Sequence, residues 1–420
     1  MARPILHIPP ALRHRRFAYM WFGLLVSMAG SQMQITALLW HLSTLSSQPI
    51  VVSGIGVARF FPILLFGPFG GLIADTINRR RVMFITQTVM TLAALALALL
   101  TWGGHIQIWH IYLLTGINAI AFAFDSPARQ ALMPNLVPEE ILPSAFSMTS
   151  IALNTGAILG PALSGIVIST LGQGYTYLFD AVSFLAVLLA LVIMGPVEQV
   201  LENRHGGVRG SLVSIKDGVQ FILHQPIILS SMLLDFVATF FSSANTLLPF
   251  VARNVLHVGE VAYGWLASSP SIGAVLVGLV MSQRTNYRRQ GALLLSSVVA
   301  FGLATMLFGL SGSFLLAMLA LLLIGASDTV STILRNTIRQ IQTPDQMRGR
   351  MIGINQIFFM GGPQLGEIEA GLVAQAFGTP LAIISGGLGC LLAVGCIAAA
   401  WPQLRRYQGD EGLAPQPAGD

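Results

Sequence analysis

Apolar runs long enough to cross a membrane follow one another along almost the entire chain. A spanning helix needs about 20 mostly apolar residues, and such runs occur twelve times, at residues 17–43, 51–74, 82–102, 108–127, 145–171, 175–196, 226–250, 262–283, 291–311, 314–334, 351–376 and 380–401. The sequence lacks the two-residue alternation of a membrane barrel. Only 9% of its residues are charged, whereas a soluble domain carries about 25%. It therefore predicts an all-α membrane protein with twelve transmembrane helices.

The basic residues predict how these helices are oriented. If the N-terminus is cytosolic, 20 of the 22 Lys and Arg residues fall in internal segments, Arg335 and Arg339 among them, while Arg253 falls outside and Arg59 within a helix. This sorting follows the positive-inside rule and predicts a multi-pass protein of the cell inner membrane with both termini in the cytosol. The first run is too long for a cleaved signal peptide.

The net charge of +5 is explained by this topology, because the basic residues lie between the apolar runs. No basic stripe carries interleaved aromatic residues, so we expect no nucleic-acid partner. The partners that we expect are the lipid bilayer, a small-molecule substrate and protons, and we expect the protein to be a monomer.

The two halves of the chain resemble each other at fixed offsets. A shift of 206 residues places Arg129 on Arg335 and aligns three glycines, and a shift of 208 places Arg80 on Arg288. One duplication with a small insertion explains both offsets, and parallel repeats of this kind are typical of secondary transporters. The repeat predicts an N-terminal six-helix bundle at 1–197, a cytosolic linker at 198–225, a C-terminal six-helix bundle at 226–407 and a disordered tail at 408–420.

The predicted linker contains apolar residues at helical spacing, namely Leu212, Ile215, Val219 and Ile222. This pattern predicts a short amphipathic helix that lies on the inner surface of the membrane.

Two segments resemble motifs of the major facilitator superfamily. Residues 71–80, GLIADTINRR, are similar to motif A, and residues 156–165, GAILGPALSG, are similar to motif C, the antiporter motif. The matching positions of motif A are Gly71, Asp75, Arg79 and Arg80, and those of motif C are Gly156, Gly160, Pro161 and Gly165. Small residues every four positions let helices approach closely, and Pro161 is expected to kink its helix.

A third segment, FDSPARQ at residues 124–130, resembles the branch that contains enterobactin exporters and macrolide efflux proteins. The resemblance extends to about residue 407 and implies two pseudo-symmetric six-helix bundles. It further implies a cytosolic latch of the motif A residues with Asp125 and Arg129, in which Asp75 caps the helix that begins near Met351 and Arg79 pairs with Asp125.

The sequence departs from the family pattern at three positions. In motif A, Thr76 replaces a basic residue and Asn78 replaces glycine. Asparagine tolerates the positive φ that a tight turn can need. Drug–proton antiporters of the family carry an arginine where this chain has Tyr112, four residues before Gly116. Proton coupling, if present, therefore needs another group.

Ionisable residues inside the apolar runs are the candidates for coupling and gating, because a charge in the bilayer is costly. Asp235 and Asp328 lie near the middle of their helices, and burial favours the protonated carboxyl, so both are proton-coupling candidates. Glu367 and Glu369 are further candidates. They lie at the same depth as Arg59, and the three residues predict an outer gate built on an ion pair. Asp180 lies close to the outer end of a helix that the resemblance places at the periphery, so we expect a structural role for it.

Neutral polar residues deep in the predicted helices are candidates to line a substrate cavity, although helix–helix hydrogen bonds explain each of them equally well: Gln32, Gln34, Asn118, Asn154, Asn245, Asn355 and Gln356. The sequence holds no nucleophile elbow, P-loop or metal-binding motif, so no enzyme activity, metal or cofactor is expected. The leading hypothesis is a proton-coupled exporter of a small amphipathic molecule such as a siderophore or a drug. The alternatives are an importer, a facilitator or a lysophospholipid flippase on the same fold, and a membrane sensor or scaffold that transports nothing.

Overall fold

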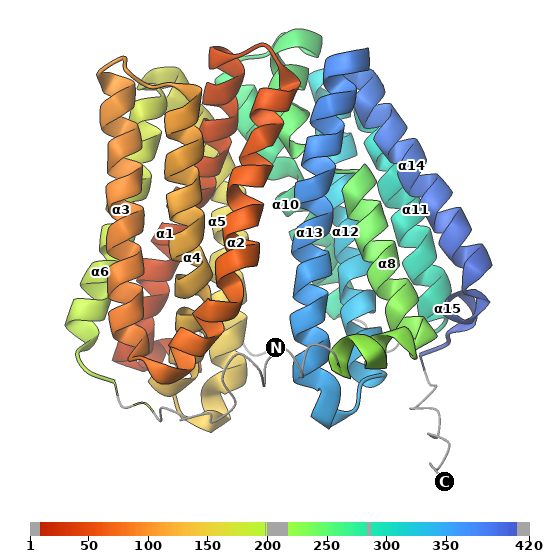
Figure 1. The fold of residues 1–420 in the computed structure, drawn as a ribbon, viewed down its shortest axis with the longest axis horizontal. Coiled ribbons are helices and arrows are strands. Elements are labelled where there is room, and N and C mark those ends of the chain that lie inside the picture. The colour runs from red at the N-terminus through yellow and green to blue at the C-terminus, as the bar shows by residue number, and fades with distance from the viewer. Residues whose placement is uncertain (1–8, 198, 200–216, 284–286, 410–420) are drawn as a thin grey trace, which may run out of the picture. The chain divides into compact units, whose positions relative to one another are not determined.

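The computed structural model describes residues 9–197, 199, 217–283 and 287–409. Within these residues the chain is helical and contains no strand (Figure 1). The long helices are α1 (Arg15–Leu45), α2 (Pro49–Thr76), α3 (Arg79–Trp102), α4 (Ile108–Leu132), α5 (Leu142–Thr170), α6 (Gln173–Met194), α8 (Pro226–Phe241), α10 (Glu260–Ser282), α11 (Gln290–Gly309), α12 (Phe314–Ile341), α13 (Asp345–Phe377) and α14 (Thr379–Ala400). Short helical segments, among them α9 (Leu248–Phe250) and α15 (Pro402–Arg406), complete the chain.

Eleven helical segments of the described residues are long and apolar enough to cross a membrane. Each corresponds to one of the predicted runs, and the all-α prediction is confirmed. The run predicted at 351–376 is the exception. It forms the long helix α13, but it is not among these eleven segments. Arg348, Arg350, Glu367 and Glu369 make α13 more polar than the other long helices.

Most helices extend beyond the predicted runs, and α4 and α12 do so by five and seven residues at their C-terminal ends. We expected α4 to end near residue 127 and α12 near residue 334, but they end at Leu132 and Ile341. Arg129 therefore lies within α4, and Arg335 and Arg339 lie within α12. Their side chains have acidic partners in the fold, and this offsets the cost of placing arginines on helices.

The chain folds as two compact units. Unit 1 comprises residues 1–45 and 58–203, and unit 2 comprises residues 46–57 and 204–420. The first turns of α2 thus belong to unit 2. There the hydroxyl groups of Ser53 and Thr246 lie 3.0 Å apart in a buried hydrogen bond. The Ser53 side chain packs directly on Gly371 of α13, where a Cβ atom would overlap it. The predicted boundary at residue 197 takes no account of this early segment.

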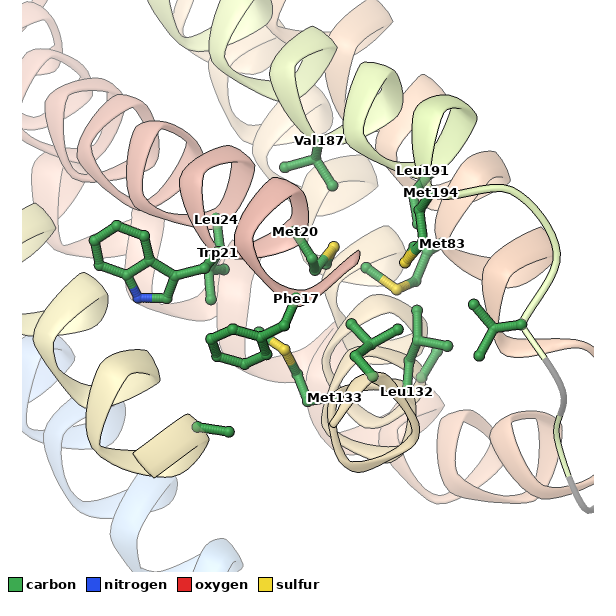
Figure 2. Packing of buried hydrophobic residues seen from close by; sticks show 14 of the residues in the cluster. Phe17, Met20, Trp21, Leu24, Met83, Leu132, Met133, Val187, Leu191 and Met194 are labelled. Carbon is green, nitrogen blue, oxygen red and sulfur yellow. The ribbon is translucent and has the colours of Figure 1, made fainter. Parts of the chain in front are cut away.

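Unit 1 is organised around α1, which packs against α5 and α6, while α3 packs against α4 and α6. An apolar core joins these helices (Figure 2). Phe17, Met20 and Leu24 of α1 meet Val187 and Leu191 of α6 there. Trp21 is anchored by its indole N–H, which donates to the carbonyl of Met148 on α5 at 2.6 Å.

In unit 2, α8 packs against α13 and α14, and α12 packs against α10 and α11 (Figure 1). The described part of the predicted linker helix, residues 217–223, is helical. Its Ile222 is buried with Met232 of α8 and Ile354 of α13, and Asp217 forms an ion pair with Arg350 at 3.1 Å. Leu212 and Ile215 of the predicted amphipathic helix, and the predicted disordered tail from residue 410, lie outside the described residues.

The glycines of motif C hold α5 against α1. A Cβ atom on Gly156 would come within 3.0 Å of Met28 and Ala29, and one on Gly160 would come within 2.7 Å of Gln32 and Ala29. Ser164, one turn further on, donates to the carbonyl of Met33 at 2.9 Å. In unit 2 the glycines 206 residues later, Gly362 and Gly366, pack in the same way against α8. The repeat found in the sequence is therefore a repeat of helix contacts.

Replacing Gly366 by leucine is expected to lower the melting temperature of the purified protein. A Cβ atom at this position would overlap the carbonyl of Phe240, and an overpacked contact costs about 1–3 kcal/mol. Gly353 of the same helix is the matched control, because nothing lies within 4 Å of a Cβ atom there. If Gly353→Leu lowers the melting temperature as much as Gly366→Leu, the close contact is not the cause.

Candidate functional site

A cluster of four charged side chains lies inside unit 2, where α8, α12 and α13 meet. Asp235 of α8 is 2% exposed, and its Oδ1 lies 3.0 Å from Nη2 of Arg335. Its other oxygen lies 3.5 Å from Nη2 of Arg339. Both arginines are 2% exposed and stand four residues apart, so they lie on the same face of α12. The buried carboxylate is thus neutralised by two cations, which offsets much of the cost of burying it.

Arg339 is held in place by groups from two further elements. Its Nε donates to the Ser231 hydroxyl at 3.1 Å and its Nη2 to the Ser231 carbonyl at 2.9 Å. Its Nη1 donates to Oδ1 of Asn355 on α13 at 2.5 Å. With these partners on α8 and α13, Arg339 is a structural tie among three helices.

Arg335 has a second acidic partner, Asp328, two turns earlier on α12. The same nitrogen, Nη2, lies 3.5 Å from Oδ1 of Asp328 and donates to the Thr332 hydroxyl at 2.8 Å. The Asp328 side chain is 44% exposed, whereas that of Asp235 is 2% exposed. Arg335 therefore stands between a buried carboxylate and an accessible one.

The cluster is electrically balanced only when both aspartates are ionised, because two positive groups then face two negative groups. A proton on either aspartate leaves an excess positive charge on the arginines. Arg335 contacts both carboxylates. When one carboxylate loses its charge, the Coulomb attraction of Arg335 to the other, still ionised carboxylate dominates. This arrangement can convert the binding of one proton into a change of ion-pair partner.

Arg335 and Arg339 are site residues that the sequence did not single out, because the positive-inside rule already explains basic residues near helix ends. Their spacing from Asp328 could have identified them. The three residues stand seven and four positions apart, which is one face of a helix. Asp235 and Asp328, both predicted as functional from their depth, are brought together here through Arg335.

The motif A region of unit 1 shows contacts that differ from the expected ones. The Arg79 guanidinium donates to the carbonyls of Ala74 and Ala131, at 3.0 and 3.1 Å, so it reaches the end of α4 through backbone groups. Arg80 donates to the Leu191 carbonyl of α6 at 2.8 Å. In these contacts carbonyl groups stand where the resemblance implied that Arg79 would meet Asp125.

Asp125 binds α3 instead. It is 1% exposed and accepts hydrogen bonds from Thr86 and Gln87, both at 2.9 Å. Arg129, one turn later on α4, lies 3.9 Å away. Asn78 also differs from expectation. Its φ is −56°, and its side chain caps α3 by accepting from the backbone N–H groups of Arg80 and Arg81. An N-cap role, rather than positive φ, therefore explains this asparagine.

The remaining candidates are scattered. Gln34 is buried, and Asn154 is exposed and donates to the carbonyl of Ser150 in its own helix. Among the other cavity candidates, Gln32 and Asn118 are half-buried, and Asn245 and Gln356 are exposed. Pro161 and Gly165 are buried in α5, while Gly71 has open space around it. The Glu367 carboxylate lies against Gly56. The Asp75 side chain lies outside the described residues, so the latch stays a prediction, as does the outer gate of Arg59, Glu367 and Glu369.

Comparison with known proteins decides the family. The family model described as transmembrane secretion effector, of the major facilitator superfamily, matches residues 8–415. The chain belongs to this family. Among curated members of the superfamily, the multidrug efflux pump Tap of Mycolicibacterium fortuitum is 26% identical over 91% of this chain and 95% of its own length. The enterobactin exporter EntS of Citrobacter koseri is 27% identical over 84% and 83%. As a member of the superfamily, the protein is a membrane transporter.

Solved structures agree on the fold. A bacterial homologue of the human lysosomal transporter Spinster, in an inward-facing and occupied conformation, has a TM-score of 0.72 at 13% identity and covers 96% of this chain and 99% of its own. A transporter of the POT family bound to a thioalcohol-conjugated peptide also has a TM-score of 0.72, at 12% identity, with 94% and 99% covered. At these identities the likeness concerns the fold of the major facilitator superfamily.

Proposed function

We propose that this transporter is an exporter of a small amphipathic molecule, such as a siderophore or a drug, in exchange for protons. It crosses the cell inner membrane twelve times, in two six-helix bundles, with both termini in the cytosol. The efflux pump and siderophore exporter among its relatives support the direction and the cargo class. The observation that carries proton coupling is the position of Arg335 between buried Asp235 and accessible Asp328.

In this mechanism Asp328 takes up the proton and Asp235 is the fixed anion. When Asp328 is ionised, Arg335 is shared between the two carboxylates. When Asp328 is protonated, Arg335 is left with Asp235, and its contact along α12 is released. α8 and α12 both contribute to the cluster, so the exchange of partners alters the force between two helices. The two protonation states thereby favour different helix arrangements.

In the Asp328→Asn variant, a pH gradient is expected to drive no transport. Exchange of substrate on one side of the membrane for substrate on the other should continue. The amide keeps the shape of the side chain but cannot take up a proton. The measurement is uptake of enterobactin, and of a fluorescent amphipathic dye, into inverted membrane vesicles with and without an imposed pH gradient. Asp217→Asn is the control, because its carboxylate lies in a half-exposed ion pair outside the cluster.

A full response of Asp328→Asn to the pH gradient would place the coupling group elsewhere. Transport by the wild type that ignores the gradient would indicate a facilitator, and gradient-driven movement in the opposite direction would indicate an importer. Movement of lysophospholipid between the leaflets of the vesicles, without uptake of either probe, would indicate a flippase. A chain that moves none of these compounds would favour a sensor or scaffold.

A further inference from the structure

Another buried carboxylate lies in unit 1, between α6 and α1, far in sequence from the arginine–aspartate cluster. Asp180 of α6 is completely buried. Its Oδ1 accepts long hydrogen bonds from Ser31 of α1 at 3.4 Å and from Ser183 at 3.2 Å, and the shorter bond of the Ser183 hydroxyl, 2.7 Å, goes to the Asp180 backbone carbonyl. Of the two oxygens of this carboxylate, Oδ2 is therefore the one without a hydrogen-bond partner in the described structure.

A second unpartnered group stands on the same face of α6. Thr176 is completely buried, and its hydroxyl also lacks a hydrogen-bond partner among the described residues. It precedes Asp180 by four residues, the spacing at which side chains of a helix are neighbours. A protonated Asp180 can donate a hydrogen bond and a hydroxyl can accept one, whereas an ionised carboxylate can only accept.

No cation neutralises Asp180 from the described helices that pack against it. On α3, Arg80 meets α6 at Leu191, eleven residues and about 16 Å along the helix from Asp180. α5 contains no ionisable residue, and the arginines of α1, Arg15 and Arg16, stand at its first turn. A titratable residue of α6, Tyr177, precedes Asp180 by three residues, and its hydroxyl lies 3.0 Å from Nδ1 of His41 on α1.

The surroundings of Asp180 exclude water. Its neighbours in sequence, Ala181 and Phe184, pack against Met90 and Ala94 of α3 in an apolar cluster. Further along, the contact between α1 and α6 is made by Leu24, Val187 and Leu191 (Figure 2). On the α1 side, a Cβ atom on Gly30 would overlap Ser183 and come within 3.0 Å of Asp180 Oδ1. An ionised carboxylate without a cation is very costly in such a place.

We propose that Asp180 is a proton-binding site of unit 1, separate from the cluster around Arg335. The proton is taken from water and joins Oδ2, the oxygen without a partner, while Oδ1 keeps the hydrogen bonds of the two serines. The oxygen–oxygen separations of 3.2 and 3.4 Å are longer than the charge-assisted hydrogen bonds that hold an ionised carboxylate, which are about 2.5–2.7 Å. The bound proton keeps α1 and α6 packed, and its loss introduces a charge that drives the two helices apart.

The proposal predicts a direction for the pH dependence of stability. Asp180 is protonated in the folded protein and ionised in the unfolded chain near neutral pH, so folding takes up a proton. Stability is then full at low pH and falls as the pH rises. Asp180→Asn removes this term, because the amide is neutral at every pH and has nearly the shape of the protonated acid.

The test is the melting temperature of the purified full-length protein in detergent, measured from about pH 5 to about pH 8 in sodium-free buffer. The wild type is expected to lose a few degrees more than Asp180→Asn over this range. Asp217→Asn, the matched carboxyl-to-amide change at a half-exposed ion pair, should retain the slope of the wild type. Parallel curves for wild type and Asp180→Asn would overturn the proposal. So would stabilisation of the wild type, and not of Asp180→Asn, by sodium ions, which would make the site a sodium site.

Infrared spectroscopy gives a readout that does not depend on unfolding. At neutral pH the wild type should show the carbonyl stretch of a protonated carboxyl that disappears in Asp180→Asn and persists in Asp217→Asn. If Asp180→Asn cannot be purified, Ser31→Ala with Ser183→Ala provides the second variant. It removes donors that stabilise the ionised form, so the band should be retained. A wild-type spectrum without the band, or a band unaffected by Asp180→Asn, would show that Asp180 does not hold the proton.

Discussion

Replacing Arg335 by glutamine is expected to abolish transport and to destabilise the protein strongly. Arg335 is 2% exposed and pairs with Asp235 at 3.0 Å and with Asp328 at 3.5 Å. Removing one partner of a buried ion pair leaves an uncompensated charge and costs about 3–5 kcal/mol. Arg339 remains, but at 3.5 Å from Asp235 it serves three other acceptors as well. The measurements are the melting temperature and uptake into inverted vesicles.

A double variant separates the structural role of Arg335 from its role in transport. Asp235→Asn combined with Arg335→Gln removes both charges of the closest pair, so much of the lost stability should return. Transport should not return, because Asp328 has lost Arg335, the arginine that would exchange partners when Asp328 is protonated. Recovery of pH-driven transport in the double variant would show that the pair is a structural element only.

The fold was accessible from the sequence because apolar run length is a strong signal in membrane proteins. Each of the eleven segments coincides with a predicted run, and the glycines that the repeat aligns lie at the equivalent contacts α5–α1 and α13–α8. The ends of the helices were less accessible. The apolar run stops before the first arginine, whereas α12 continues through Arg335 and Arg339, and Asp235 on another helix pairs with both. A contact between helices cannot be read from one helix.

The candidate site shows the same limit. The depth of Asp235 and Asp328 in their apolar runs marked both residues, but only the structure shows that one nitrogen of Arg335 joins them. Asp180 illustrates the converse case. Its position near a predicted helix end suggested a structural residue at the periphery. In the structure Asp180 is completely buried, and α1 approaches it closely at Gly30.

In unit 1, Asp125 is expected to matter far more for stability than its neighbour Arg129. Asp125→Leu would leave the buried Gln87 amide without its acceptor at 2.9 Å, whereas the Thr86 hydroxyl keeps a second acceptor, the Met83 carbonyl at 3.1 Å. Each unsatisfied buried polar group costs about 1–3 kcal/mol, and Oε1 of Gln87 already lacks a partner in the described structure. The expected loss is therefore about 1–3 kcal/mol, measured as a lower melting temperature and lower yield of folded protein.

Asp125→Asn and Arg129→Gln complete the series. The amide oxygen in the Asp125→Asn variant still accepts hydrogen bonds from α3. This change should therefore cost about 1 kcal/mol, the difference between hydrogen bonds to a charged and to a neutral acceptor. Arg129 lies 3.9 Å from Asp125, beyond hydrogen-bond range, and is more exposed than Arg335. Because the separation is long and Asp125 keeps its hydrogen bonds from α3, Arg129→Gln should cost less than about 1 kcal/mol. The repeat makes Arg129 and Arg335 equivalent in sequence, yet the buried acceptor lies on another helix only for Arg335. Equal losses in the two arginine variants would contradict this account, because burial and partner distance, rather than repeat position, set the expected order.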